Sequence, residues 1–374
     1  MLQTVEARTL KTPFGARSLI LTDITPQAVG LPDFAGHERI WLGRDEQRGL
    51  TAIVAIHSTV LGPALGGTRI WPHPTFEAGL TDALRLSHGM TLKAAISSVP
   101  FGGGKAVILA DPKTDKTPEM LDAYAEMLSA LAGQYFTAED VGLSLADANY
   151  LGDRAPNVTG TTRGGSGNPS PVTAHGVFLG LKAALKHRRG SDELSGVRVA
   201  VQGLGSVGWA LAEKLHAEGA RLVVADIDSK RVTKAVGAFG AETSTPKTIV
   251  SADVDIFAPC ALGGVICAET MPKLKAEIIA GAANNQLATD EDAVRLMQLG
   301  VLYAPDFVIN AGGLMNVAAE LAPSGYDRAA TMAKVEEIPA TLTAILERAK
   351  AEKRSTVDVA ETIAAERISA AARH

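Results

Sequence analysis

Short apolar runs alternate with helically spaced apolar residues through the first half of the chain. The run LTAIVAI (50–56) predicts a buried strand, which ends at the Gly- and Pro-rich segment LGPALGGTRIWPHP (61–74). From residue 76 to about 97, apolar residues recur at steps of three and four, which predicts a helix. Its stripe is formed by Leu80, Leu84, Ser87, Met90, Lys93 and Ala94. Lys93 therefore lies on or beside the apolar face, either as a lysine that extends its charge to water or as a ligand-binding group.

The pattern continues as strand, helix and strand. AVILA (106–110) predicts a strand, and TPEMLDAYAEMLSALAG (117–133) predicts a helix that Gly133 would cap. YFTAEDVGLS (135–144) reads as a strand running into a loop with two adjacent carboxylates. The segment 154–176 is dense in Gly, Pro, Ser and Thr, and it is the expected crossing between two domains.

The second half opens with a predicted helix (173–187) and a dinucleotide-binding pattern. The strand VRVAVQ precedes GLGSVG, an amphipathic helix follows, and the strand RLVVAD ends at Asp226. The glycines at 203, 205 and 208 would let the backbone approach a pyrophosphate at the helix N-terminus. Asp226 can accept hydrogen bonds from the ribose hydroxyls and would repel a 2′-phosphate, which favours NAD over NADP. The nearby Lys230 and Arg231 would soften that repulsion.

Three further segments each read as a strand ending in a loop of small or polar residues. They are 254–264, 276–287 and 300–317. Ligands of open α/β sheets bind at the carboxyl ends of such strands, so these loops should line the nicotinamide end of the site.

The segment VPFGGGKAVILADP (99–112) carries three consecutive glycines before Lys105. A phosphate loop needs a glycine where Val99 stands and a Ser or Thr where Ala106 stands, so that interpretation fails. The run is either an ordinary glycine turn or a loop that brings Lys105 to a substrate.

Composition narrows the class of protein. The chain has 374 residues, 46% hydrophobic and 21% charged, which suits a globular protein of two domains. A net charge of −5 argues against a nucleic-acid partner. We expect no membrane span and no leader peptide, because no apolar run is long enough and the N-terminus lacks an apolar region. Two cysteines and unpaired histidines indicate a reducing, cytoplasmic location and no metal site.

Seven motifs in order resemble the amino-acid dehydrogenases, most closely the leucine, valine and phenylalanine branch of the glutamate dehydrogenase superfamily. The motifs are GPALGGTR (62–69), GMTLKAA (89–95), PFGGGKAVI (100–108), TAEDVG (137–142), GLGSVG (203–208), GAANNQL (281–287) and INAGGLMNV (309–317). The resemblance implies reversible oxidative deamination of an L-amino acid with NAD to a 2-oxo acid and ammonia. It assigns Lys105 as catalytic base, Asp140 as the acid that assists proton transfer, and Lys93 as the ligand of the substrate carboxylate.

The chemistry makes these roles reasonable. Hydride transfer from the α-carbon leaves an imino acid that water must attack, and the water needs a base with a pKa near the working pH. A lysine in water is too strongly protonated, but burial and a second ammonium group would lower its pKa. Lys93 would then stay charged while Lys105 acts as base, with Asp140 restoring charge balance. Gly66 and Gly67 would let the backbone crowd the substrate carboxylate.

By family position, the substrate side chain should meet an apolar set. The residues expected to bind substrate, besides Lys93, are Leu65, Gly66, Gly67, Met90, Ala138, Thr159, Asn285, Leu314 and Val317. Such a pocket favours leucine, valine or isoleucine, since a second carboxylate would be uncompensated. Leu314 and Met315 depart from the residues of a leucine enzyme, so phenylalanine or tryptophan stays open.

The resemblance also implies the remaining site and the architecture. Residues expected to contact NAD are Thr173, Gly203, Gly205, Ser206, Val207, Gly208, Asp226, Ile227, Cys260, Ala261, Ala283 and Asn284. The fold class is α/β, with an N-terminal substrate domain (1–165, with helices at about 345–374 packing back), a Rossmann-type NAD domain (166–344) and the active site in the cleft between them. A homo-oligomer is implied. The alternatives are an NAD-dependent dehydrogenase of another small molecule and a non-catalytic NAD-sensing protein, which would have no chemical reason to keep Lys93, Lys105 and Asp140 together.

Overall fold

The computed structural model of the protein describes residues 7–9 and 18–373, and the chain divides into two compact units. Unit 1 comprises Met1–Asn168, Asn316–Asp327 and Ala365–His374, and unit 2 comprises Pro169–Met315 and Arg328–Ala364. The N-terminal segment for which we expect no leader peptide lies almost wholly outside the described residues.

The units are less contiguous along the chain than the expected domains. Residues 316–327 belong to unit 1, and of the C-terminal segment only residues 365–374 do. Helix α12 (Ile338–Glu352) instead packs on α5 (Ser170–Arg189) within unit 2.

Unit 1 contains a mixed sheet of eight strands in the order β1-β2-β3-β4-β7-β5-β8, with β6 paired to β7 beside this path. Neighbours from β1 to β4, and β4 with β7, are antiparallel, whereas β5, β6 and β8 add parallel pairs. The strands are β1 (Ala7–Thr9), β2 (Ile20–Asp23), β3 (Arg39–Asp45), β4 (Leu50–Ser58), β5 (Ala64–Leu65), β6 (Thr68–Trp71), β7 (Gly102–Leu109) and β8 (Tyr135–Phe136).

Three helices of unit 1, α2, α3 and α4, begin at side-chain caps. Thr75 and Thr117 accept hydrogen bonds from the backbone of Ala78 and Met120, and Ser144 forms a capping box with Asp147. The helices are α1 (Thr25–Ala28), α2 (Phe76–Ile96), α3 (Pro118–Ala130) and α4 (Leu145–Gly152). The expected cap at Gly133 is wrong, because α3 ends at Ala130 and Gly133 lies in the following turn with φ +81°.

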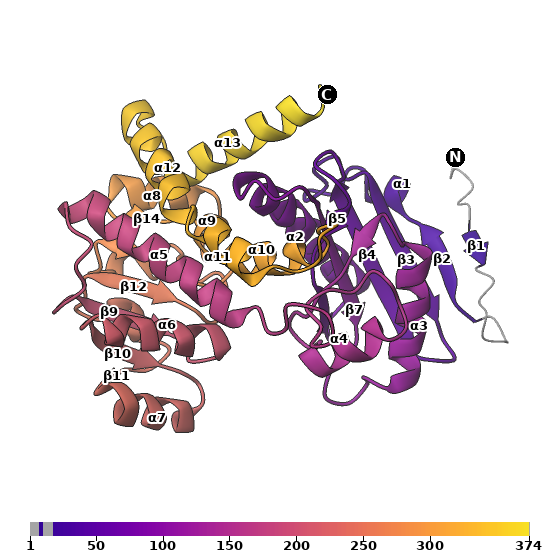
Figure 1. The fold of residues 1–374 in the computed structure, drawn as a ribbon, viewed down its shortest axis with the longest axis horizontal. Coiled ribbons are helices and arrows are strands. Elements are labelled where there is room, and N and C mark those ends of the chain that lie inside the picture. Colours follow the sequence, from indigo (N-terminus) through magenta and orange to yellow (C-terminus); the bar gives the residue numbers. More distant parts are fainter. Residues whose placement is uncertain (1–6, 10–17, 374) are drawn as a thin grey trace. The chain divides into compact units, whose positions relative to one another are not determined.

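The central strands of unit 1 are buried on both faces, between α2 and the pair α3 and α4 (Figure 1). In β4, Ala52, Val54 and Ile56 join the core with α3, while Ile53 and Ala55 join the core with α2. This alternation follows the two-residue period of a strand, and it explains why the run LTAIVAI is apolar without interruption.

The glycine run is the first half of strand β7 and not a loop. A Cβ atom on Gly102 would lie 1.9 Å from the carbonyl oxygen of Ser58, and one on Gly103 would lie 2.1 Å from Oγ1 of Thr91 on α2. On Gly104 it would lie 2.8 Å from the Tyr135 ring. The glycines therefore remove side chains where neighbouring backbone and rings press on the strand.

Unit 2 contains a sheet in the order β11-β10-β9-β12-β13-β14 with every pair parallel. Counted from its own first strand, this order is 3-2-1-4-5-6, the order of the dinucleotide-binding fold. The strands are β9 (Arg198–Gln202), β10 (Arg221–Ala225), β11 (Glu242–Thr243), β12 (Ile256–Pro259), β13 (Ile278–Ile279) and β14 (Leu302–Tyr303). The reversal of direction beside β9 puts the expected ligand crevice at the ends of β9 and β12.

Helices surround this sheet, and they replace one expected loop. The segment after β14 forms α9 (Asp306–Ile309) and the start of α10 (Gly312–Ala319). A Cβ atom on Gly312 would lie 2.5 Å from the carbonyl oxygen of Val172 on α5. Gly312 therefore allows close helix packing and does not form a turn. The other helices of unit 2 are α6 (Ser206–Ala217), α7 (Ser229–Phe239), α8 (Glu291–Gln298) and α11 (Arg328–Val335), with short 3₁₀ turns at Ile249–Ser251 and Met271–Lys273. Helix α13 (Thr356–Ala371) begins in unit 2, and its residues from Ala365 onward belong to unit 1.

The contact of α2 with β7 can be tested by two alanine substitutions. Gly103→Ala should destabilise the protein by about 3 kcal/mol, because the new methyl group would meet the Thr91 backbone nitrogen at 2.2 Å. Gly89→Ala is the matched control on α2, where a Cβ atom meets nothing within 4 Å, and it should stabilise by up to about 1 kcal/mol. Denaturant unfolding of both variants gives the comparison. Equal stabilities would contradict the packing argument.

Candidate active site and nucleotide site

The centre of the candidate site in unit 1 is an ion pair between Lys105 and Asp140. Lys105 follows the glycines of β7 and is only 6% exposed, and its Nζ donates to Oδ2 of Asp140. The other oxygen of Asp140 accepts from the backbone N–H of Val141 at 2.8 Å. Because side chains alternate along β7, Lys105 shares the α2 face with Val107.

Burial and charge act in opposite directions on the carboxylates of this loop. Burial works to raise the pKa of Asp140, but the charges of Lys105 and Arg69 and the hydrogen bonds outweigh it, so the pKa of Asp140 is lowered. The pKa of Glu139 is raised by its own burial and by the charge of Asp140. The nearby cations therefore favour the ionised form of Asp140, whereas burial disfavours the ionised form of Glu139.

Two glycines bring the chain of β5 and β6 against this pair. A Cβ atom on Gly66 would lie 1.7 Å from the carbonyl oxygen of Gly104, and one on Gly67 would lie 3.0 Å from Cβ of Asp140. The expected pair Gly66 and Gly67 is therefore packed directly beside Lys105 and Asp140, where no larger residue fits.

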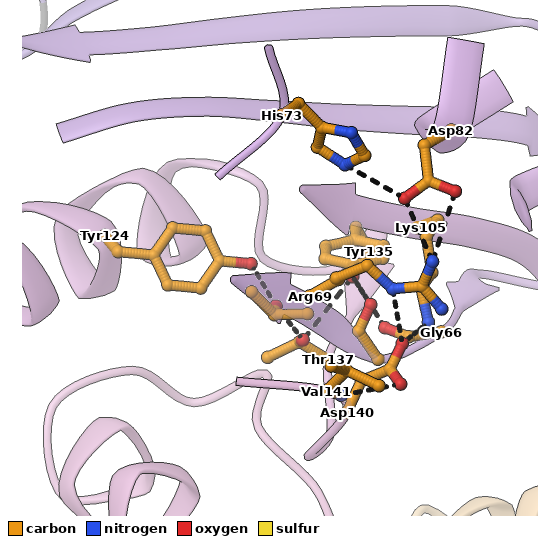
Figure 2. Close-up of polar contacts among 12 residues, drawn as sticks. Gly66, Arg69, His73, Asp82, Lys105, Tyr124, Tyr135, Thr137, Asp140 and Val141 are labelled. Atoms are coloured by element: carbon orange, nitrogen blue, oxygen red, sulfur yellow. Dashed lines mark hydrogen bonds and ion pairs between the residues drawn. The ribbon is translucent and has the colours of Figure 1, made fainter. Parts of the chain in front are cut away.

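A buried chain of hydroxyl groups is hydrogen-bonded to the backbone of Gly66 (Figure 2). Tyr135 donates to the Gly66 carbonyl oxygen at 2.6 Å. Oγ1 of Thr68 lies 2.5 Å from the Tyr124 hydroxyl and 2.6 Å from Oγ1 of Thr137. With every hydroxyl partnered, the network fixes the backbone on both sides of the ion pair.

Several expected substrate residues gather around the same glycines. Cγ of Met90, on α2, lies 3.4 Å from the position of a Gly66 Cβ. Ala138 and Val317 are buried, and both lie within 4 Å of the Cβ position of Gly160. Leu65 is buried in β5, and Thr159 is fixed by two hydrogen bonds to the Thr137 carbonyl oxygen.

Helix α2 also carries Lys93, which is half-buried one turn before the helix ends. The end of α2 is held by Arg367 of α13, whose Nη1 donates to the carbonyl oxygens of Ala95 and Ile96 at 2.9 and 2.6 Å. A guanidinium at the carbonyl end of a helix satisfies orphan acceptors and the negative end of the dipole.

The segment 159–167 is fastened to residue 320 by one carboxylate. Both oxygens of Glu320 accept from the Gly160 N–H, at 2.9 and 3.0 Å, and one also accepts from the backbone and hydroxyl of Ser166. A cavity of about 260 Å³ lies beside this contact. Its lining includes Asn149, Asp153, Thr159, Arg163 and Glu320. Glu320 therefore fastens the segment directly after Thr159, an expected substrate residue, to residues 316–327 of unit 1.

In unit 2, the GLGSVG motif forms a tight turn between β9 and α6. Gly203 has φ +95°, and a Cβ atom on Gly208 would lie 2.0 Å from the Gly203 carbonyl oxygen. No side chain caps α6 at Gly205, so the N–H groups of its first turn, from Ser206 and Val207 onward, are available to an anion.

Asp226 directly follows β10 and is hydrogen-bonded to this turn. Its side chain is 6% exposed, and its oxygens accept from the N–H groups of Leu204 and Asp228 at 2.6 and 2.8 Å. Arg231 lies 3.8 Å away, and the side chain of Ile227 is 95% exposed. A buried carboxylate and an exposed apolar side chain here fit the ribose and adenine parts of a dinucleotide.

The other expected nucleotide contacts occupy the ends of neighbouring strands. Cys260 and Ala261 follow β12, and Ala261 packs against Gly203. Burial raises the pKa of the Cys260 thiol to about 12, and both cysteines are free. Asn284 accepts from Asn310 at 2.9 Å, and Asn285 has φ +51°. Thr173, Ala283, Asn285 and Leu314 also belong to unit 2, so Asn285 and Leu314 lie in a different unit from the other expected substrate residues.

Sequence reasoning missed three groups of the site. Arg69 stands in the quoted motif GPALGGTR, 4.0 Å from Asp140, and could have been found as a charged residue within a glycine motif. Tyr135 gave no signal beyond a strand pattern. Glu320 acts on Gly160 across 160 positions, a separation that local patterns do not report.

The comparisons agree with this two-unit arrangement. A model described as Glu/Leu/Phe/Val dehydrogenase, dimerisation domain, matches residues 38–157, and one described as Glutamate/Leucine/Phenylalanine/Valine dehydrogenase matches residues 164–232 and 225–374. The leucine dehydrogenase of Bacillus subtilis (strain 168) is 48% identical over 334 residues, 89% of this chain and 91% of the relative. The L-tryptophan dehydrogenase of Nostoc punctiforme is 46% identical over 334 residues, 89% of this chain and 94% of the relative. The crystal structure of L-tryptophan dehydrogenase from that organism matches with a TM-score of 0.76 and 45% identity, covering 90% of this chain and 97% of its own.

The fold, the glycine turn and the relatives define an oxidoreductase that acts on amino acids with a pyridine nucleotide. The chain belongs to the glutamate/leucine/phenylalanine/valine dehydrogenase family. Within the part of the chain that the structure describes, none of the helices could cross a membrane.

Proposed function

We propose that the protein catalyses the NAD-dependent reversible oxidative deamination of apolar L-amino acids, with leucine, valine and isoleucine preferred. The observation that carries this proposal is the buried pair of Lys105 and Asp140 beside Gly66 and Gly67. A lysine that a carboxylate holds in a nearly water-free site is suited to proton transfer and poorly suited to a structural surface role.

In the proposed reaction, a bound nicotinamide would supply the acceptor for the hydride of the substrate α-carbon. Lys105, as the neutral amine, takes a proton from the water that attacks the resulting imino carbon. Asp140 exchanges a proton with the amino nitrogen, which leaves as ammonia. The two residues touch each other, so a proton that Lys105 takes from water can pass through Asp140 to the amino nitrogen, which returns the pair to its starting charge.

Lys93 is the proposed ligand of the substrate carboxylate. It lies one helical turn after Met90 on α2, and Met90 packs against the site of Gly66. A half-buried ammonium binds a carboxylate more strongly than an exposed one, because less water screens the pair.

The preference for branched aliphatic side chains is supported by the apolar residues around Gly66 and Gly160. Leu65, Met90, Ala138 and Val317 bring hydrocarbon to this region, and a charged substrate side chain would be desolvated there without a partner. Apolar pockets separate substrates by only about 1–3 kcal/mol per methylene group, so we expect a graded profile.

NAD is the proposed cofactor because the side chain of Asp226 lies beside the glycine turn, next to the expected position of the ribose. Its carboxylate could accept the ribose hydroxyls and would repel a 2′-phosphate, although Arg231 at 3.8 Å weakens that repulsion. Thr173, Gly203, Gly205, Gly208 and the strand-end residues from Cys260 to Asn284 would contact the rest of the dinucleotide. We further propose a homo-oligomer in the cytoplasm, supported by the family description of a dimerisation domain and by two free cysteines.

The proposed function is tested by NADH formation with NAD⁺ and leucine, valine, phenylalanine, tryptophan or glutamate. We expect the highest kcat/KM for a branched aliphatic amino acid and none for glutamate. Turnover of aromatic amino acids alone would contradict the proposed preference and keep the chemistry. Binding of NAD without any turnover would support a regulatory protein instead.

Lys105→Ala should lower kcat by about 10²–10⁴-fold, the usual contribution of a general base, while amino acid and NAD still bind. Lys116→Ala is the matched control, since Lys116 pairs with Asp147 elsewhere in unit 1. Stopped-flow turnover with calorimetric binding separates the two effects. Near-normal turnover in Lys105→Ala would remove its assigned role.

Asp226→Ala should weaken the binding of NAD much more than the binding of NADP. The ratio of the two dissociation constants should change by about tenfold or more. The ratio is the readout because the carboxylate also supports the Leu204 backbone, whose loss affects both cofactors. Asp192→Ala, at an exposed position before β9, should leave the ratio unchanged. Equal losses for both cofactors in Asp226→Ala would rule out the ribose contact.

A further inference from the structure

A row of alternating charges extends from the catalytic pair into unit 1 (Figure 2). Lys105 pairs with Asp140, and Nε of Arg69 lies 4.0 Å from the same oxygen of Asp140. Nη1 of Arg69 donates to both oxygens of Asp82 at 3.0 and 3.2 Å, and Nε2 of His73 lies 3.2 Å from Asp82. The signs of the first four groups run positive, negative, positive, negative.

Arg69 is anchored by Asp82 and not by Asp140. Its hydrogen bonds go to Asp82 of α2, whereas its Nε is buried and has no hydrogen-bond partner. The side chains of Arg69, Asp82 and Asp140 are 22%, 22% and 18% exposed, so little water screens their charges. Arg69 therefore places a fixed positive charge near Asp140 without forming a hydrogen bond to the oxygen that Lys105 contacts.

The need for this charge follows from the two protonation states of Lys105. With Lys105 protonated, Asp140 has a cation in direct contact. When Lys105 is the neutral base, Asp140 loses that cation, and a buried carboxylate without a cation takes up a proton. A guanidinium does not lose its proton at any pH at which the protein is folded, so Arg69 still balances Asp140 in that state.

We propose that Arg69 is a positioning residue that acts through Asp140: it is the permanent counter-charge that keeps Asp140 ionised while the proton on Lys105 comes and goes. This inference rests on the proposed function for its place in the reaction. The electrostatic link from Arg69 to Asp140 can be measured without it.

The other groups that face Asp140 do not replace this charge. Among the described residues, Lys105 comes from β7, Arg69 from β6 and Tyr135 from β8, and Glu139 is the chain neighbour. Glu139 is a carboxylate whose own pKa is raised by burial and by the charge of Asp140, so it supplies no positive charge to Asp140. Beyond Arg69, the facing groups are Asp82 and His73. Arg69 is thus the cation beside Asp140 that does not titrate.

The decisive experiment compares the titration of Asp140 in the wild type and in Arg69→Gln. Isotope-edited infrared spectroscopy with ¹³C-labelled aspartate follows the protonated carboxyl band, and Asp140→Asn identifies the contribution of Asp140. Loss of an opposite charge at this distance should raise the pKa of Asp140 by about one to three units, a tenfold or greater gain in proton affinity. An unchanged titration of Asp140 would overturn the proposal.

Two variants separate charge from structure. Arg69→Lys keeps the charge and should restore most of the wild-type titration, while Arg39→Gln makes the same chemical change in the exposed pair with Asp23 and should have no effect. If Arg69→Gln does not fold, Arg69→Met removes the same charge and keeps an unbranched side chain. It should raise the pKa of Asp140 in the same way, and an unchanged titration of Asp140 in that variant would overturn the proposal.

The pH profile of kcat/KM in Arg69→Gln then tests the function separately. Its acid limb should move to higher pH by at least one unit, because Asp140 is protonated more readily and Lys105 holds its proton more tightly. A raised Asp140 titration with an unmoved acid limb would keep the role of Arg69 and remove Lys105 and Asp140 from the proton transfers.

Discussion

The close approach of helix α2 to strand β7 is the constraint on which the site of unit 1 depends. Gly103 lies so near the backbone of Thr91 that no side chain fits, and Gly66 lies equally near the carbonyl group of Gly104. Helix α2, strand β7 and the segment of Gly66 therefore approach one another backbone to backbone, with no side chains between them. Lys105, the next side chain on that face of β7, meets Asp140 in a space already closed to most water.

The charges around Asp140 favour its ionised form. Asp140 is ionised despite burial because cations approach it from two strands, and Asp82 holds one of them in place. The hydroxyl groups of Thr68, Tyr124 and Thr137 carry no charge, so they fix backbone positions without changing the charge around Asp140. Polar groups of two kinds thus share one core: neutral ones set geometry and ionised ones set proton affinity.

The sequence predicted the elements better than their packing. The strand, glycine turn, helix and terminal acid of unit 2 form a local pattern, and Asp226 lies where that pattern places it. The run at Gly102–Gly104 was misread as a loop, because glycine spacing reports freedom of the backbone and not what presses on it. Lys105 and Asp140, which are paired in the structure, were identified as site residues only through the resemblance of their motifs to the amino-acid dehydrogenases. Glu320 could not be found, since its partners lie about half the chain away.

Unit 1 is assembled from three separate stretches of chain, and this gives its formation an order in time. During synthesis, the strands and α2 are complete long before residues 316–327 and 365–374 emerge. Until Arg367 is made, the last carbonyl groups of α2 have no guanidinium cap, and until Glu320 is made, the N–H of Gly160 lacks its carboxylate. A nascent chain therefore holds an unfinished first unit until its last residues are made. A C-terminal truncation before Arg367 would leave the end of α2 without its guanidinium cap.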